Sequence, residues 1–168
     1  MNKNPLFTAF FLLLSACGTA DTQPPLSEAP LAGASIGAPF TLTDQDGKRR
    51  SDSEFAGKYR IIYFGYTQCP DICSPDMQHL MSGLKQFEKA HPDLAGKVQP
   101  IFISVDPKRD TPEKLKQFVS AFHPRLIGLT GHADEIATVA KAFATTYLIE
   151  PGRSYTDYLV NHMHLAYL

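Results

Sequence analysis

The sequence has three cysteines, a net charge close to zero and, near its N-terminus, an apolar run that is too short to cross a bilayer. Its 16 basic residues are balanced by 17 acidic ones, and no basic stripe is present, which argues against nucleic acid as a partner. The run from Leu6 to Leu14 is much shorter than the roughly 20 residues of a membrane-spanning helix. A hydrophobic content of 43% in 168 residues is enough for one domain with a buried core.

The first residues follow the pattern of an export signal, because Lys3 precedes the apolar run, which leads to Leu14-Ser15-Ala16-Cys17. Small residues before a cysteine resemble a bacterial lipobox. We therefore predict that residues 1–16 are a lipoprotein signal peptide and that Cys17 is the lipid-modified first residue of the mature protein. An ordinary signal peptide, or a buried N-terminal helix with an incidental cysteine, is the alternative. Residues 17–35 are rich in Ala, Pro, Thr, Gly and Ser and predict a flexible tether, which places the globular domain at residues 36–168.

Apolar strands alternate with amphipathic helices along the rest of the chain, which predicts an α/β fold with a largely parallel central sheet. The predicted strands form a hairpin around the turn Asp44–Gly47, continue through the buried core, and end in two C-terminal strands: 40–50, 59–66, 98–105, 126–129, 147–149 and 155–168. The predicted helices begin with capping residues: 74–90 (Ser74 as N-cap, Pro75 as first residue), the segment opening at Asp110-Thr111-Pro112-Glu113, and 134–145.

Cys69 and Cys73 lie between the strand 59–66 and the helix that follows it. Positions i and i+4 share a helical face, so the two residues are within reach of a disulfide, and the same pair can instead clamp one soft metal ion. The spacing alone does not separate these uses. We expect the helix N-terminus to lower the pKa of both thiols.

A third metal ligand would have to come from one of six histidines. His79 faces another side of its helix, His91 and His123 precede prolines at helix ends where solvated caps are expected, and His132 opens a helix. His162 ends an apolar strand, where a hydrogen-bonded histidine is more common than a ligand. The residues alone leave its role open.

The stretch Gly65-Tyr66-Thr67-Gln68-Cys69-Pro70-Asp71-Ile72-Cys73 resembles the signature of the Sco/SenC copper chaperones. Three further segments match the family in the same order, namely Ile103–Pro112, Gly128–Gly131 and Tyr158–His162, so that the resemblance covers about residues 36–168. It implies a thioredoxin-like fold with an N-terminal β-hairpin extension.

The same resemblance implies copper bound by Cys69, Cys73 and His162, with Cys69 and Cys73 also the candidate disulfide. It implies delivery of copper to the binuclear centre in the copper-accepting subunit of cytochrome c oxidase, by a protein that is lipid-anchored at the periplasmic face of a bacterial membrane. Asp106 matches an acidic position of the family and is a second-shell candidate; a strand-end aspartate that caps a turn is the alternative.

The sequence departs from the family pattern at three places. Asn161 stands where the family usually has aspartate, and Ser74 intervenes between the second cysteine and Pro75. Relatives continue beyond the position of Leu168 through another strand and a C-terminal helix, so the expected fold lacks these two elements and leaves a sheet edge uncovered. His164 points to the same side as His162 on a strand, and we interpret it as a bystander.

The leading hypothesis is a copper metallochaperone, which is not an enzyme. The alternative is a thiol–disulfide oxidoreductase that keeps the cysteines of its target reduced for metallation, although its C-x-x-x-C spacing differs from the usual C-x-x-C. A thioredoxin-like peroxidase and a purely structural Cys69–Cys73 disulfide are less favoured, because no polar cradle for peroxide is evident and because the candidate histidine favours copper.

Overall fold

The computed structural model describes residues 33–154 and 157–168. The chain divides into two units, Met1–Ser35 and Ile36–Leu168, and the account below concerns the second. The predicted signal peptide, Cys17 and most of the predicted tether lie outside the described residues. Within the described ranges, no helix has both the length and the apolar character needed to cross a membrane.

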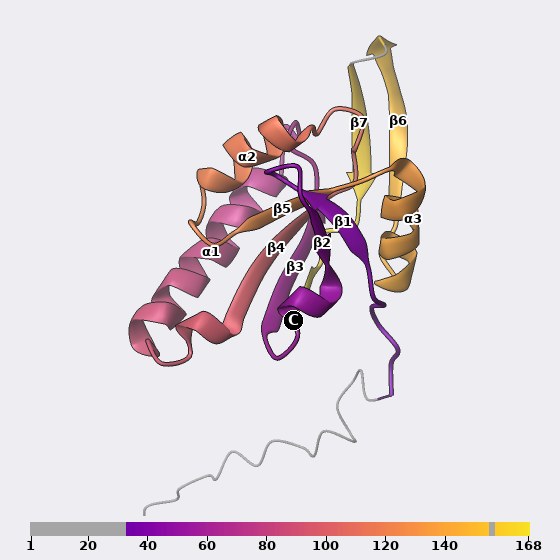
Figure 1. Ribbon diagram of the computed structural model, residues 1–168. Helices are drawn as coiled ribbons and strands as arrows, with labels where there is room; N and C mark the ends of the chain where they lie inside the picture. The colour runs from indigo at the N-terminus through magenta and orange to yellow at the C-terminus, as the bar shows by residue number, and fades with distance from the viewer. Residues whose placement is uncertain (1–32, 155–156) are drawn as a thin grey trace, which may run out of the picture. The chain divides into compact units, whose positions relative to one another are not determined.

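The described strands of the second unit form a six-stranded sheet in the order β2-β1-β5-β4-β3-β8 and a separate hairpin of β6 and β7 (Figure 1). Their bounds are β1 Thr41–Asp44, β2 Arg49–Ser51, β3 Tyr59–Gly65, β4 Val98–Ser104, β5 Ile127–Thr130, β6 Tyr147–Ser154, β7 Asp157–His162 and β8 Ala166–Tyr167. Only the three middle strands, β3 to β5, run parallel. The prediction of a largely parallel sheet is therefore too broad, because β1 pairs antiparallel with β5 at one side of this group and β8 pairs antiparallel with β3 at the other.

Helix α1 (Cys73–Ala90) connects β3 to β4, and α2 (Pro112–Ser120) connects β4 to β5. Both crossovers step in the same direction along the sheet, which places both helices on one face. Helix α3 (Ala133–Ala142) lies on the other side of the sheet (Figure 1). Two short 3₁₀ helices, η2 (Asp52–Phe55) and η3 (Ala95–Lys97), complete the described elements.

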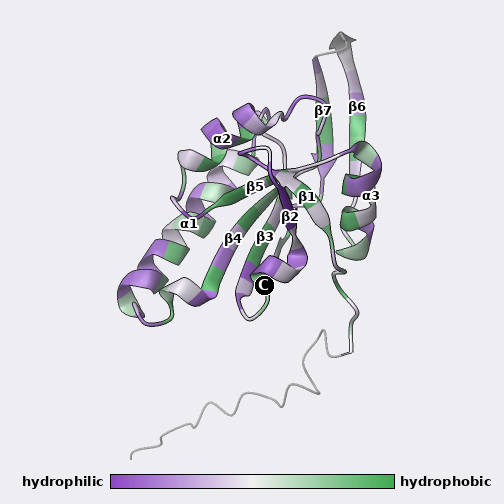
Figure 2. Ribbon diagram, viewed as in Figure 1, coloured by the Kyte–Doolittle hydropathy of each residue, from purple (hydrophilic) through white to green (hydrophobic). Residues whose placement is uncertain are grey.

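Side-chain alternation along the middle strands assigns the two faces of the core. Phe102 packs on Phe118 of α2 with ring centroids 4.9 Å apart, whereas Phe64 packs on Phe143, just after α3, at 5.6 Å. Every residue of β4 is buried, and the hydropathy colouring shows β3 and β4 as predominantly apolar (Figure 2). Met77 and Met81 belong to this core, as expected of a packing stripe rather than of thioether ligands.

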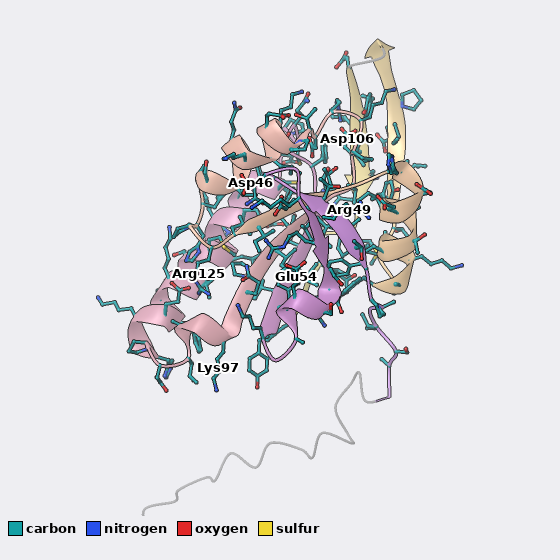
Figure 3. The ribbon with its side chains drawn as sticks, viewed as in Figure 1. Asp46, Arg49, Glu54, Lys97, Asp106 and Arg125 are labelled. Carbon is teal, nitrogen blue, oxygen red and sulfur yellow. The ribbon has the colours of Figure 1, made fainter. Side chains whose placement is uncertain are left out.

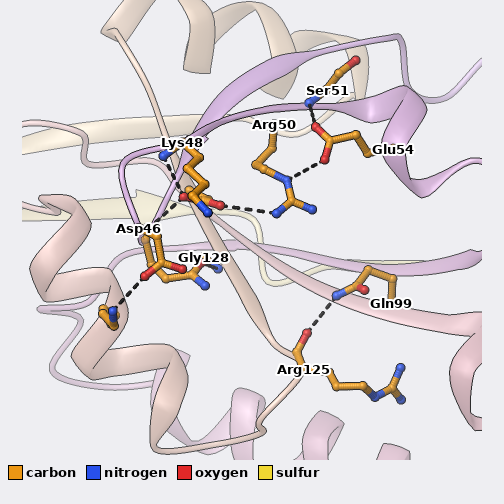
Figure 4. A network of polar contacts seen from close by, with 11 residues as sticks. Asp46, Lys48, Arg50, Ser51, Glu54, Gln99, Arg125 and Gly128 are labelled. Atoms are coloured by element: carbon orange, nitrogen blue, oxygen red, sulfur yellow. Dashed lines mark hydrogen bonds and ion pairs between the residues drawn. The ribbon is translucent and has the colours of Figure 1, made fainter.

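The predicted hairpin turn at Asp44–Gly47 is confirmed. The Asp44 carboxylate accepts hydrogen bonds from the backbone N–H groups of Asp46 and Lys48, both at 2.9 Å, which closes the turn between β1 and β2. Figure 4 shows these contacts together with the capping box of η2, in which the Ser51 N–H donates to Glu54 at 2.7 Å.

Several predicted boundaries are wrong. The strand predicted at 147–149 continues to Ser154, and the helix predicted at 134–145 spans Ala133–Ala142. Helix α1 begins at Cys73 with Ile72 as its N-cap, and the Asp76 N–H makes the first helical bond, to the Ile72 carbonyl at 3.0 Å. Pro75 is therefore the third helical residue, a position whose N–H has no helical partner in any case. The predicted strand 155–168 is interrupted: β7 ends at His162, and β8 pairs with β3 in the central sheet.

Candidate metal centre

Cys69 and Cys73 are positioned by the turn that joins β3 to α1. The Cys69 N–H donates to the Tyr66 carbonyl at 3.3 Å, and Cys73 is the first residue of the helix. Gly65 ends β3 directly beneath the pair, and a Cβ atom there would lie only 3.1 Å from the Cys73 Sγ. Glycine therefore allows the strand to approach the thiol closely, and a larger residue would have to displace its neighbours.

His162 reaches the cysteines from β7, whose residues alternate between exposed and buried positions. Its Nε2 lies 3.2 Å from the Cys73 Sγ. One donor atom from each of Cys69, Cys73 and His162 falls within 4.8 Å of the other two, in an arrangement able to hold a metal ion. Cys69 and His162 line a cavity of about 270 Å³, and Cys73 lies buried behind them. The structure thus brings the three predicted ligands together, although they span about ninety positions of sequence.

The hydrogen bonding of His162 leaves its inner nitrogen available as a ligand. The Nδ1 lies 3.1 Å from the Met163 carbonyl, a group that can only accept, which assigns the proton to Nδ1 and a lone pair to Nε2. The rings of Tyr63 and Tyr66 meet the imidazole edge-on, at centroid distances of 6.2 and 6.0 Å. Burial lowers the pKa of His162 below 6.5, so the neutral, metal-binding form is favoured.

The two thiols differ, contrary to the expectation that the helix N-terminus lowers both pKa values. Partial burial raises the pKa of Cys69, but hydrogen bonds from the backbone N–H groups of Cys73, Asp71 and Ile72 outweigh it, and the net pKa is below the ordinary value. Complete burial of Cys73 raises its pKa well above the ordinary value. Both thiols are free in the structure. Cys69 is therefore the more acidic of the two thiols, and Cys73 is the one that keeps its proton.

Asp76 and Tyr63 support the first turn of α1 and were not identified from the sequence as part of the site. The Tyr63 hydroxyl donates to the Asp76 carboxylate at 2.8 Å, and burial raises the pKa of Tyr63, which keeps that proton in place. A tyrosine on the face of β3 that contacts α1 could have been inferred from strand alternation. Its partner on the helix could not.

Asp106, the predicted second-shell residue, is buried at the end of β4 with 1% of its surface exposed. Its carboxylate accepts a hydrogen bond from the Tyr158 hydroxyl at 2.6 Å and forms an ion pair with Arg109. Its backbone carbonyl also accepts from the Asp110 N–H at 2.9 Å, which agrees with the turn-capping alternative. Its contacts therefore reach β7 four residues before His162.

The remaining histidines are distributed along the fold. His91 is the exposed C-cap of α1 and His132 the N-cap of α3. The expectation that His123 is solvated is wrong, because it is 3% exposed and lies 3.3 Å from a Glu88 carboxylate oxygen. His79 lines a larger apolar groove of about 720 Å³ along α1, away from the cysteines.

His164 and Asn161 lie at the rim of the candidate centre and line the same cavity as Cys69 and His162. The His164 ring is exposed, with its centroid 4.9 Å from that of His162. The Asn161 amide donates to Glu150 at 3.4 Å on the exposed face of β7. The family departure at Asn161 therefore falls on the side of the strand opposite the His162 ring.

Comparison with known proteins agrees with this geometry. A family model described as SCO1/SenC matches residues 28–168. Protein SCO1 homolog 1, mitochondrial, of Arabidopsis thaliana is 42% identical over 144 residues, covering 85% of this chain and 42% of the relative. The structure of Bradyrhizobium japonicum ScoI with copper bound superposes with a TM-score of 0.71 at 42% identity, covering 79% of this chain and 81% of that one.

A more distant structure is that of BsSco, a member of the Sco family of cytochrome c oxidase assembly proteins in which a disulfide switch has been identified. It superposes with a TM-score of 0.56 at 25% identity, covering 77% of this chain and 82% of that one. The chain spans about half the length of the curated relatives that it matches. The match over residues 28–168 and the shared thioredoxin-like fold show that the chain belongs to the SCO1/SenC family.

Proposed function

We propose that the protein is a copper metallochaperone that binds copper(I) as cargo through Cys69, Cys73 and His162. The observation that carries this proposal is the convergence of two sulfur atoms and one imidazole nitrogen within 4.8 Å. Thiolates and imidazole are the ligands that copper(I) prefers, whereas a structural zinc site requires a fourth ligand. The relative with 42% identity from Bradyrhizobium japonicum was solved with copper bound, which supports the same cargo.

The charge at the site suits reversible binding. Cys69 is partly exposed, has the lower pKa of the two thiols and provides the first ligand, while binding at Cys73 has to displace a proton from a buried thiol. With both cysteines deprotonated and His162 neutral, one copper(I) ion gives a centre of net charge −1, which the N-terminus of α1 favours. The exposed side of Cys69 is also where a recipient ligand would begin the exchange.

The recipient in this proposal is the copper-accepting subunit of cytochrome c oxidase. The description of the distant relative BsSco as a member of a family of cytochrome c oxidase assembly proteins supports it. We further propose that Cys17 carries the lipid that anchors the protein at the periplasmic face of a bacterial membrane. That part of the proposal rests on the N-terminal sequence pattern alone.

An anaerobic titration of the reduced protein with copper(I), against a competing chelator, tests the proposal. We expect one equivalent bound by the wild type and none bound tightly by the Cys69→Ser/Cys73→Ser variant. His162→Ala should weaken copper(I) binding at least about tenfold, because even the loss of a residue that hydrogen-bonds a metal ligand costs about that much affinity. The exposed His91 gives the matched control, His91→Ala, with unchanged affinity. Tight binding that survives the loss of both cysteines would refute the assignment.

A second candidate function is thiol–disulfide exchange, which the unequal cysteines favour. The Cys69 thiolate would attack a disulfide of a target protein, and Cys73 would then resolve the mixed disulfide. The target disulfide is reduced to two thiols while the pair is oxidised to a Cys69–Cys73 disulfide. The disulfide switch identified in BsSco supports this chemistry.

His162→Ala separates the two functions, because disulfide exchange requires the cysteines and not the imidazole. We expect this variant to reduce a model disulfide at a rate similar to that of the wild type while its copper affinity falls. If exchange and copper affinity fall together, the imidazole acts on the thiols rather than as a ligand for copper.

A further inference from the structure

The loop between β4 and α2, residues 106–110, contacts both halves of the candidate metal centre. We call it the clamp loop. One end of it bonds the turn that carries Cys69, and the other bonds β7, which carries His162. Figure 3 shows Asp106 in this loop, in the part that faces β7.

On the cysteine side, the contact is made by Asp110, which is completely buried. Its carboxylate accepts hydrogen bonds from the Thr67 N–H at 2.9 Å, the Thr67 hydroxyl at 2.7 Å and the Ser104 hydroxyl at 2.6 Å. Thr67 lies two residues before Cys69. A buried carboxylate with three donors fixes that turn against the end of β4.

On the histidine side, the contact is made by Arg109 and Asp106 with a single residue of β7, Tyr158. The Tyr158 hydroxyl donates to Asp106 at 2.6 Å, and the Arg109 guanidinium donates to the Tyr158 carbonyl at 2.8 Å. The guanidinium also stacks on the Tyr158 ring, 3.6 Å from its centroid. The backbone and the side chain of Tyr158 are thus held at the same time.

These contacts matter because, in the part of the chain that the structure describes, neither strand of the hairpin pairs with the central sheet; the backbone pairing with that sheet nearest to His162 is that of β8 with β3, four residues after it. Within the described ranges, β6 and β7 pair only with each other and not with the central sheet. On the N-terminal side of His162, the place of β7 relative to the central sheet therefore depends on side-chain contacts. Tyr158, Val160 and His162 are the buried residues of β7. Holding the first of them fixes the last, because an extended strand is a stiff spacer of roughly 3.3 Å per residue.

We propose that Arg109 and Tyr158 are positioning residues that place the His162 imidazole against Cys73, while Asp110 places the turn of Cys69. The clamp loop links these two positioning contacts, because the Asp110 N–H donates to the Asp106 carbonyl at 2.9 Å. It thereby sets the separation between the thiol half and the imidazole half of the centre. This inference rests on the proposed copper-binding function.

A double-mutant cycle on copper(I) affinity tests the assignment of the two halves. Tyr158→Phe removes the hydroxyl that bonds Asp106 and retains the ring under Arg109. We expect it to weaken copper(I) binding about tenfold, the cost of a hydrogen bond to a charged group, and to have no further effect when His162 is already alanine. Arg109→Lys keeps the charge, loses the planar contact and should follow the same pattern.

Thr67→Val is the matched variant on the cysteine half, because it removes only one donor to Asp110 and keeps the side-chain shape. We expect Thr67→Val to weaken copper(I) binding less than Tyr158→Phe does, and by the same factor in the wild-type and His162→Ala backgrounds. Glu88→Gln breaks the remote ion pair with Arg125 and controls for general destabilisation, so it should lower the melting temperature and leave copper affinity unchanged.

The result that overturns the inference is a Tyr158→Phe effect of equal size in both backgrounds, or wild-type affinity in that variant. Failure of the proposed function gives a different result. The wild type itself would then bind no copper(I), or His162→Ala would bind copper(I) as tightly as the wild type. Copper X-ray absorption of Tyr158→Phe provides a second readout. We expect fewer nitrogen neighbours per copper than in the wild type and an unchanged number of sulfur neighbours.

Discussion

Replacing Gly65 with alanine is the most stringent test of the packing beneath the cysteine pair. The added Cβ would lie 3.0 Å from Phe102 Cε2, 3.0 Å from Tyr63 Cε1 and 3.1 Å from the Cys73 Sγ. These separations are shorter than ordinary van der Waals contacts, and the two aromatic rings are themselves buried in the core. The methyl group therefore has to displace the sulfur atom, the aromatic side chains or the end of β3.

Overpacking of a core by one methyl group costs about 1–3 kcal/mol of unfolding free energy. For a domain of this size, that corresponds to a fall in Tm of about 4–12 °C. If the added methyl group displaces the Cys73 sulfur, copper(I) binding also weakens, by about fivefold for each kcal/mol of binding free energy lost. Thermal denaturation of the apo protein measures the loss of stability, and a chelator-competition titration of the same sample measures the loss of copper(I) affinity.

Gly83 provides the matched control, because it lies on the exposed side of α1 with no atom within 4 Å of an added Cβ. Gly83→Ala should stabilise the helix by about 0.5–1 kcal/mol and leave copper affinity unchanged. If Gly65→Ala behaves like Gly83→Ala, with an unchanged or higher Tm and wild-type affinity, the close approach of β3 to Cys73 does not constrain the site.

Three other predictions concern the residues at the candidate metal centre. Burial lowers the pKa of His162 below 6.5, so the unfolded chain binds more protons than the folded one in acid. The unfolding free energy of the apo protein should therefore fall by up to about 1.4 kcal/mol per pH unit as the pH drops below 6.5. His162→Gln should remove the contribution of this residue to the pH dependence of the unfolding free energy. Cys69, with its lowered pKa, should be alkylated by iodoacetamide at a lower pH than a free thiol, while buried Cys73 reacts only on unfolding; equal rates for the two would contradict the assignment. His164→Ala should change copper(I) affinity by less than about threefold, since its ring is exposed beside the site, and a tenfold loss would make it a ligand.

The parts of the fold that depend on neighbouring residues could be predicted from the sequence. The turn at Asp44–Gly47, the buried strand before the cysteines and a helix start within residues 110–113 each carry a local signal, and the structure has all three. The third candidate ligand required more, because His162 lies at the end of an apolar strand in a pattern that a structural histidine fits equally well. Its resemblance to a family segment, rather than its periodicity, singled it out.

The contacts that organise the site could not be predicted, because they join segments far apart in the chain. Asp110 belongs to a helix-start pattern in the sequence, yet Thr111 caps α2 and Asp110 bonds Thr67 instead. The raised pKa of Cys73 also depends on burial by the whole core, which competes with the helix N-terminus and outweighs it. Separation of the β6–β7 hairpin from the central sheet likewise leaves no local signal.

X-ray absorption at the copper edge tests the central claim most directly. The reduced wild-type protein, loaded anaerobically with one equivalent of copper(I), should show two sulfur neighbours and one imidazole nitrogen per copper, and His162→Ala should show the two sulfurs alone. Identical spectra for the wild type and His162→Ala, or a copper site without sulfur, would contradict the account.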